Sequence, residues 1–262
     1  MTLFDTHAHY WDSRFSAEYG KDETETLLDT LLSGDVPYIV NVATDPASAR
    51  LAIGQAARHP GMLTALGIHP SDGQMLADPD AAIAEIEAML RDPASRAVAV
   101  GEIGLDYHYE GTDREKQHAL FRAQMKLAER LSLPVVIHDR DAHGDSVAIV
   151  REFPNVRGIF HSYSGSAEMA RELCALGYYI SFSGTVSFKN AERVRAAAAA
   201  VPRERLLIET DCPYLAPHPH RGRLNHSGYL SFTNEALAAA IGLSPEECAA
   251  LTTENAKRIF NL

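Results

Sequence analysis

Two histidines lie one residue apart at the end of a short apolar run, in the segment 4–9 (FDTHAH). Side chains at positions i and i+2 of a β-strand point to the same face. If the run is a strand, the imidazoles of His7 and His9 therefore reach one point beyond its end. Imidazole nitrogens are good ligands for zinc, manganese and other transition ions. The pair predicts a metal site, although such a short pattern carries little weight alone.

The same arrangement returns in four later segments, where an acid or a histidine follows an apolar run. These residues are Glu102, His138, His161 and Asp211. A carboxylate has two oxygens, so Glu102 is able to bridge two metal ions, and His138 and His161 supply nitrogen ligands for the second ion. Asp211 would bind the first ion with one oxygen and accept a proton from metal-bound water with the other. Glu209, two residues earlier, would orient a ligand or Asp211 itself.

Two metal ions roughly 3.5–4 Å apart stabilise the attacking and leaving oxygens of a displacement at phosphorus. We therefore predict a metal-dependent hydrolase that uses metal-activated water, with Asp211 and Glu102 as catalytic residues. The chain contains no nucleophile elbow, Walker loop or paired-cysteine motif that would favour another reaction. The sequence leaves the metal open among Mg²⁺, Mn²⁺, Zn²⁺ and similar ions.

Four further residues are candidates for substrate binding. His69 ends the third apolar run, and Arg140 lies two residues beyond His138. Arg221 and Arg223 lie in the loop after Asp211. Arginine binds phosphate with two parallel hydrogen bonds, which suits a phosphodiester substrate. An ordinary surface or packing role is equally consistent with the sequence for each of the four.

The overall charge limits how nucleic acid would be bound. The 262 residues carry a formal net charge of −11, and 46% of them are hydrophobic. This balance is typical of a globular protein and argues against a broad basic face for nucleic acid. It allows an enzyme that holds a phosphodiester through metal ions, since bound cations reverse the local field.

The cysteines and the N-terminus bear on the cellular compartment. Cys174, Cys212 and Cys248 are odd in number and widely spaced, which predicts no disulfide framework. The first residues have no basic segment followed by an apolar core, and no apolar stretch is long enough to span a bilayer. We therefore expect a cytoplasmic protein with no membrane contact and no obligate protein partner.

Short apolar runs alternate with longer amphipathic segments along the whole chain. The expected strands are 3–6, 38–42, 63–67, 97–101, 135–137, 158–160, 178–181 and 206–209. The expected helices are 23–32, 47–58, 80–90, 115–131, 145–152, 167–176 and 191–200, and a capping box at 244–247 begins another.

This alternation predicts an α/β protein with parallel strands and crossover helices. The length is close to the roughly 250 residues of a (β/α)8 barrel. We predict a distorted (β/α)8 TIM barrel that forms a single domain over residues 1–262, with the six candidate ligands around one rim. An open doubly wound sheet is the alternative, but it would scatter these ligands.

At this point the chain resembles the TatD family of metal-dependent hydrolases, within the amidohydrolase-like barrels. The resemblance rests on the motifs DTHAH (5–9), GIHP (67–70), GEIGLDY (101–107), LPVVIH (133–138), HSYSG (161–165), ETDCPYL (209–215) and NAKR (255–258). It departs from the family pattern at 10–11 (YW) and at 221–227 (RGRLNHS), where a basic residue, an acid and a proline are missing.

The resemblance implies a TIM barrel that depends on divalent metal and cleaves DNA, commonly as a 3′→5′ exonuclease. It also implies the ligand sets: His7, His9, Glu102 and Asp211 for one ion, and Glu102, His138 and His161 for the other. DNA, single-stranded or at its 3′ ends, would be the substrate. The alternatives are a metallohydrolase of an ester or amide, such as an aminoacyl-RNA or a small metabolite, and a barrel that only binds a partner.

Overall fold

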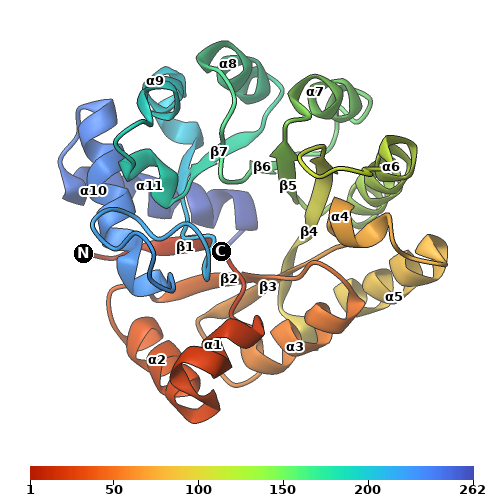
Figure 1. Cartoon of the computed structure of the whole chain (residues 1–262), viewed down its shortest axis with the longest axis horizontal. Coiled ribbons are helices and arrows are strands. Elements are labelled where there is room, and N and C mark those ends of the chain that lie inside the picture. Colours follow the sequence, from red (N-terminus) through yellow and green to blue (C-terminus); the bar gives the residue numbers. More distant parts are fainter.

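A single sheet of parallel strands forms the centre of the molecule. The computed structural model describes residues 1–262. Its eight strands pair in sequence order (Figure 1). They are β1 (Phe4–Ala8), β2 (Tyr38–Val42), β3 (Met62–Leu66), β4 (Ala97–Asp106), β5 (Val135–Arg140), β6 (Gly158–Phe160), β7 (Tyr179–Phe182) and β8 (Leu206–Ile208).

Helices surround the sheet on its outer side. The α-helices are α1 (Ser13–Tyr19), α2 (Lys21–Ser33), α3 (Pro46–Ala56), α4 (Pro70–Gly73), α5 (Pro79–Arg91), α6 (Arg114–Leu131), α7 (His143–Arg151), α8 (Ala167–Ala175), α9 (Glu192–Ala200), α10 (Leu230–Ile241) and α11 (Pro245–Phe260). Short 3-10 turns are η1 (Pro93–Ser95), η2 (Gly184–Ser187), η3 (Arg203–Arg205) and η4 (Ser227–Tyr229).

The first and last strands meet, so the sheet is a nearly closed barrel. Ala8 forms an isolated parallel bridge with Cys212. The amide of His9 donates to the carbonyl of Cys212 at 2.8 Å, and the amide of Asp211 donates to the carbonyl of His7 at 2.9 Å. The pairing register shifts between β1 and β2, β3 and β4, and β4 and β5. The prediction of a distorted, single-domain (β/α)8 barrel is confirmed.

Successive residues of a strand point alternately into the barrel and toward the helices. The buried hydrophobic residues therefore form an inner cluster and an outer cluster. The inner cluster of 13 buried residues includes Phe4, Val136, Ile159 and Leu207. The outer cluster of 52 buried residues packs the strands against the helices. Phe260 of α11 belongs to the inner cluster and stacks on Phe4, with ring centroids 5.8 Å apart. Because Phe4 begins β1, α11 covers the amino-terminal end of the barrel.

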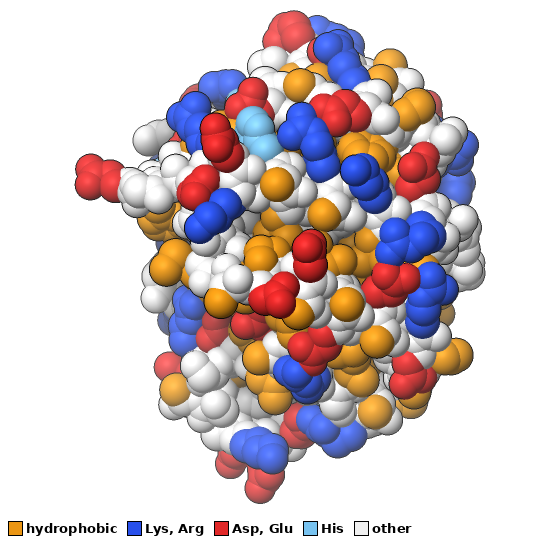
Figure 2. All heavy atoms as spheres, turned by 90° about the vertical axis from the view of Figure 1, so that its right-hand side faces the viewer, with side chains coloured by type: hydrophobic (Ala, Val, Ile, Leu, Met, Phe, Trp, Pro, Cys, Tyr) orange, Lys and Arg blue, Asp and Glu red, His pale blue; other side chains and the backbone are white.

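The helical exterior carries charges of both signs. Glu87 of α5 pairs with Arg91 and with Arg130 of α6, and Arg122 pairs with Glu152. Figure 2 shows acidic and basic side chains mixed over the side where α5 and α6 lie. None of the helices has the length and the apolar character needed to cross a membrane. The three cysteines are free and buried.

The predicted strands all exist, but three extend at least two residues further than expected at their carboxyl ends. Strand β1 reaches Ala8, β5 reaches Arg140, and β4 continues to Asp106, five residues beyond its predicted end. The apolar pattern stops where strands leave the core and begin to carry polar side chains, so it underestimates strands that extend into a site. Helices α1, α4 and α10 were not predicted.

Gln124 of α6 ties its helix to the segment that leads to the predicted site. Its side chain accepts from the amide of Ile68 at 2.8 Å and donates to the Ile68 carbonyl at 2.9 Å. Gln124→Leu leaves both buried groups without partners, so we expect it to lower the free energy of unfolding by about 3 kcal/mol. Urea titration followed by circular dichroism measures this. Lys126→Leu, exposed on the same helix, should change it by less than about 0.5 kcal/mol.

Candidate metal centre

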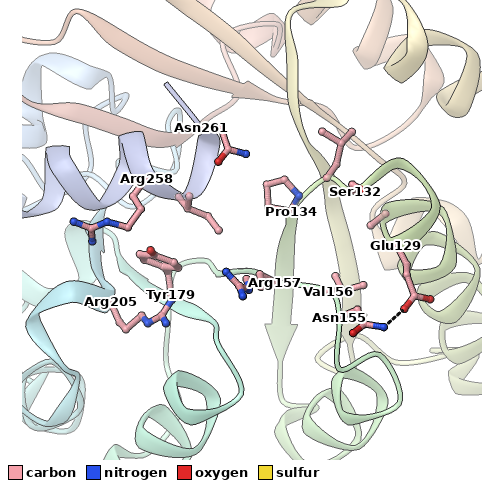
Figure 3. Close-up of a pocket in the computed structure, with 13 residues that line it drawn as sticks. Glu129, Ser132, Pro134, Asn155, Val156, Arg157, Tyr179, Arg205, Arg258 and Asn261 are labelled. Atoms are coloured by element: carbon pink, nitrogen blue, oxygen red, sulfur yellow. Dashed lines mark hydrogen bonds between the residues drawn. The ribbon is translucent and has the colours of Figure 1, made fainter.

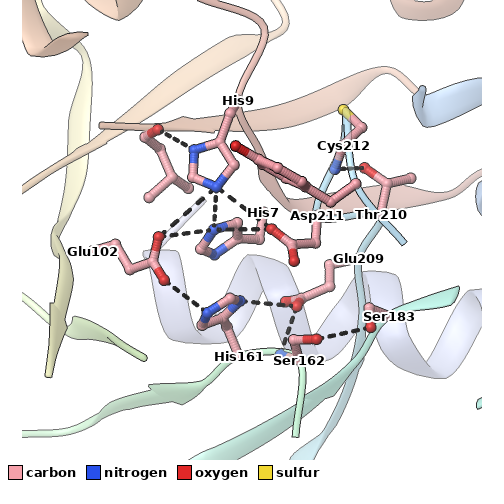
Figure 4. A network of polar contacts seen from close by, with 12 residues as sticks. His7, His9, Glu102, His161, Ser162, Ser183, Glu209, Thr210, Asp211 and Cys212 are labelled. Atoms are coloured by element: carbon pink, nitrogen blue, oxygen red, sulfur yellow. Dashed lines mark hydrogen bonds and ion pairs between the residues drawn. The ribbon is translucent and has the colours of Figure 1, made fainter. Parts of the chain in front are cut away.

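The six predicted ligands come from the carboxyl ends of five strands. His7 lies within β1, Glu102 within β4 and His138 within β5. The other three follow a strand end: His9 follows β1, His161 follows β6 and Asp211 lies three residues beyond β8. Parallel strands bring their carboxyl ends to one rim of a barrel. The structure therefore brings the six side chains together at that rim, where His7, His9, Glu102 and His161 are buried and His138 and Asp211 are half-buried. Figure 4 shows five of them, all except His138.

One group of donor atoms surrounds a point between β1, β4 and the segment after β8. The Nε2 atoms of His7 and His9 lie 3.1 Å apart. Oε2 of Glu102 is 3.5 Å from Nε2 of His7 and 3.8 Å from Nε2 of His9. Oδ1 of Asp211 is 3.8 Å and 3.4 Å from the same two nitrogens. Two nitrogens and two carboxylate oxygens thus converge as the ligands of one cation would.

A second group surrounds the other oxygen of Glu102. Its Oε1 is 2.7 Å from Nδ1 of His138 and 2.8 Å from Nε2 of His161. The two nitrogens are 3.3 Å apart. Each oxygen of one carboxylate therefore faces a different pair of histidines. This donor set fits two neighbouring divalent ions that share Glu102, because imidazole and carboxylate ligands suit transition ions and Mn²⁺.

The electrostatics of the cluster favour positive charge. Burial raises the pKa of Glu102, but the charges of His161 and His69 outweigh it and bring that pKa well below its usual value. Burial likewise raises the pKa of Asp211, and the hydrogen bond from His9 more than compensates. Both acids are therefore ionised. Carboxylates must be deprotonated to bind a metal.

The pKa values of the ligand histidines shift in opposite directions. Burial lowers the pKa of His7, and the charge of His161 lowers it further. Burial also acts to lower the pKa of His138, but Asp106 and Glu102 outweigh it and raise that pKa to about 9. The acids thus attract a cation next to His138, and a metal ion would replace the proton there.

Groups behind the ligands orient two of the histidine rings. Nδ1 of His9 lies 2.7 Å from the carbonyl of Val42. Oε1 of Glu209 is 3.2 Å from Nδ1 of His161 and accepts from the amide of Ser162 at 2.6 Å. The structure thus places Glu209 against a ligand and not against Asp211. Such contacts fix the ring and leave the other nitrogen free for a metal.

Asp5 joins the two strands that close the barrel. Its Oδ1 accepts from the amide of Thr210 at 2.9 Å, and its Oδ2 accepts from the hydroxyls of Thr210 and Ser227 at 2.6 and 2.7 Å. Burial raises its pKa to about 6. Because Thr210 precedes Asp211, this acid holds the β1 and β8 ligands together.

Asp106 was not predicted as a site residue, although it lies in the GEIGLDY motif. Its Oδ2 is 3.2 Å from Nε2 of His138. Asp106, His69 and His138 form a third group of donor atoms that lie within 4.8 Å of one another. Asp106 is four residues after Glu102 on β4, and residues i and i+4 of a strand share a face. This signal was hidden because the strand was expected to end at residue 101.

The four predicted substrate contacts are divided between the cluster and its surroundings. His69 lies inside, with Nε2 3.7 Å from Oε1 of Glu102. Arg140 lies outside it at the end of β5, over the ring of Tyr109. The guanidinium of Arg221 lies over the ring of Phe188, 3.8 Å from its centre. Arg223 lies in the same exposed loop as Arg221.

Comparison with known proteins agrees with this geometry. The family model described as TatD related DNase matches residues 4–261. The chain is 39% identical to an uncharacterized metal-dependent hydrolase, YabD, of Bacillus subtilis, with 99% of both chains covered. It is 36% identical to YcfH, another uncharacterized metal-dependent hydrolase, of Escherichia coli K12, covering 100% of this chain and 97% of that one.

A solved structure shows the same fold. The crystal structure of YJJV, a TatD homologue from Escherichia coli K12, superposes with a TM-score of 0.89 at 28% identity. The alignment covers 99% of this chain and 98% of that chain. A full-length family match, relatives above 30% identity and a common barrel lead to one assignment. The chain belongs to the TatD-related DNase family.

Proposed function

We propose that this metal-dependent hydrolase of the TatD family is a deoxyribonuclease that cleaves DNA phosphodiester bonds from the 3′ end. The observation that carries the proposal is the position of Glu102. Its two oxygens face two separate pairs of histidines, at 3.5 Å from His7 on one side and 2.8 Å from His161 on the other. A shared carboxylate is how a protein holds two cations at the spacing that phosphoryl chemistry uses.

The distances among the donor atoms support an assignment of residues to each ion. His7, His9, Glu102 and Asp211 would hold one ion, and Glu102, His138 and His161 would hold the other. Two divalent ions such as Mg²⁺, Mn²⁺ or Zn²⁺ would acidify water and stabilise the attacking and leaving oxygens.

The protein side chains supply the proton transfer. The shortest contacts of Asp211 with His7 and His9 are made by its Oδ1, at 3.8 and 3.4 Å, which leaves Oδ2 for the water. Because the pKa of Asp211 lies below its usual value, this oxygen is available to accept the proton of the attacking water. Glu209 keeps the ring of His161 in position from behind.

A pocket at the same end of the barrel as the metal centre offers a path for the DNA strand. It has a volume of about 570 Å³ and is lined in part by Phe188, Lys189, His218 and Arg221. These residues lie on the loops after β7 and β8, at the same end of the barrel as Glu102. Cationic side chains beside an aromatic ring suit the phosphates and bases of a single strand. His69, Arg140 and Arg223 are the other proposed contacts at this end.

Metal content tests the two-ion arrangement. We expect two ions per chain after loading with Mn²⁺ and gel filtration, measured by elemental analysis. The double variant His138→Ala and His161→Ala removes the nitrogen ligands of one ion only, so it should retain one. His108→Ala, an exposed histidine of the same end, should retain two. Two ions in the double variant would contradict the assignment.

Substitution of Asp211 tests the reaction. Asp211→Asn keeps the shape but removes the ionised acceptor, so we expect kcat on a single-stranded DNA oligomer to fall roughly 10²–10⁴-fold. Gel electrophoresis of a 5′-labelled oligomer with Mg²⁺ or Mn²⁺ measures this and shows the polarity of cleavage. The exposed Asp80→Asn should retain full activity. An unaffected Asp211→Asn variant rejects the proposed role.

The same preparations distinguish the alternative reaction. An ester or amide hydrolase would also need an activated water, so its site would look alike. A parallel assay on an aminoacylated RNA and a small acyl ester separates the two. Turnover of an acyl substrate with intact DNA favours the alternative, and a metal-loaded protein inactive on every substrate favours a binding role.

Arg221 tests the path of the strand. Arg221→Ala removes one cationic contact with a phosphate, so we expect KM for the oligomer to rise about tenfold while kcat changes little. The slope of log KM against log salt should fall by about 0.7, the value for one phosphate contact with a single strand. Arg171→Ala, on the outer helix α8, serves as the control. Equal effects of the two variants would place the strand elsewhere.

A further inference from the structure

A second pocket lies at the opposite end of the barrel from the metal centre. It has a volume of about 380 Å³. Pro134, Arg157, Tyr179 and Arg205 line it, and each either precedes or begins one of the strands β5 to β8. The pocket therefore opens at the amino-terminal rim. Arg258 and Asn261, at the carboxyl end of α11, form its opposite wall (Figure 3).

Three arginines line this pocket. Figure 3 shows Arg157, Arg205 and Arg258 around the ring of Tyr179. Glu129 is the only acid among the 13 lining residues, and its Oε1 accepts from the side chain of Asn155 at 3.2 Å. None of the three arginines lies within 4 Å of a carboxylate. The pocket is thus a positive region in a chain whose net charge is −11.

Contacts within the protein hold the side chains of Arg205 and Arg258, but they use only some of the guanidinium N–H donors. Nη1 of Arg205 donates to the carbonyl of Gly177 at 3.2 Å, and its guanidinium lies over Tyr179, 4.8 Å from the ring centre. Nη1 of Arg258 donates to the side chain of Asn255 at 3.0 Å. Each retains further N–H groups that face no partner in the protein.

Arg157 differs because its side chain makes no hydrogen bond or ion pair at all. Its Cγ lies 3.8 Å from the position that a Cβ at Gly177 would occupy, so its aliphatic part packs beside the residue that Arg205 binds. Arg157 and Arg205 thus flank one backbone segment. Arg157 is exposed at the wall of the pocket, and because its guanidinium has no partner in the protein, its donors are available for a ligand.

We propose that this pocket binds a small ligand with a phosphate monoester group, of about the size of a mononucleotide. Guanidinium groups bind phosphate through paired, charge-assisted hydrogen bonds. The side chains of Ser132, Asn155 and Asn261 add polar groups for the rest of the ligand. The volume falls in the roughly 300–1,000 Å³ range of small-molecule sites. The inference does not depend on the reaction at the metal centre.

Calorimetric titration of the metal-loaded protein with AMP tests this proposal. Because AMP also approaches the metal centre, the decisive comparison is between variants. Arg157→Glu reverses one charge of the pocket without breaking a hydrogen bond or an ion pair inside the protein. We expect it to weaken the pocket's component of AMP binding by at least about tenfold and to leave DNA cleavage unchanged. Inorganic phosphate should compete for that component, and adenosine should not.

A matched substitution separates a specific loss from a general change of charge. Arg203→Glu reverses an exposed arginine two residues before Arg205 that does not line the pocket, and it should bind AMP as the unmodified protein does. Equal thermal midpoints for the two variants would show that both remain folded. AMP binding that is the same in Arg157→Glu and Arg203→Glu, or adenosine binding as tightly as AMP, overturns the proposal.

Discussion

A carboxylate buried among imidazoles is the interaction on which the site depends. Glu102 is 3% exposed, and an ionised acid in such a place is costly unless positive or polar groups surround it. His7, His138 and His161 supply them from three other strands. No local segment of the chain is able to provide these partners, so the acid is acceptable only in a fold that gathers several strand ends. The closed barrel meets that requirement and leaves Glu102 between two groups of nitrogens.

The regular part of this arrangement could be predicted because it is periodic. Strand β6 was predicted with its observed bounds, and β2 as well, since their apolar residues stop where the strand stops. The ligands at strand ends followed from the same reasoning. Asp106 did not, because its position next to His138 depends on β4 continuing past Glu102 into the site. Polar residues at the end of a strand resemble a loop when only hydrophobic spacing is considered.

Contacts between distant segments were also beyond reach of the sequence. Phe188 and Arg221 lie 33 positions apart, as their numbers show, and form one wall of a pocket only because the loops after β7 and β8 are neighbours. The choice of Glu209 between orienting Asp211 and orienting His161 depended on side-chain direction in the same way. The spacing of residues along one strand shows which side chains share a face. Which of them contact each other depends on the position of the neighbouring strand.

The two ends of the barrel show how one set of strands supports opposite electrostatics. Arg157 and His161 enclose β6, and Arg205 and Glu209 enclose β8; in each pair the residues are four positions apart and share a face. Four residues of strand span about 13 Å, so each strand carries a guanidinium at one rim and a metal-centre residue at the other. Ile159 and Leu207 fill the interior between them. This apolar layer keeps the arginines away from the metal centre. Without it, the arginines would compete with the histidines for Glu102 and Glu209. A cation site and an anion site are therefore compatible on the same strands because the core separates them.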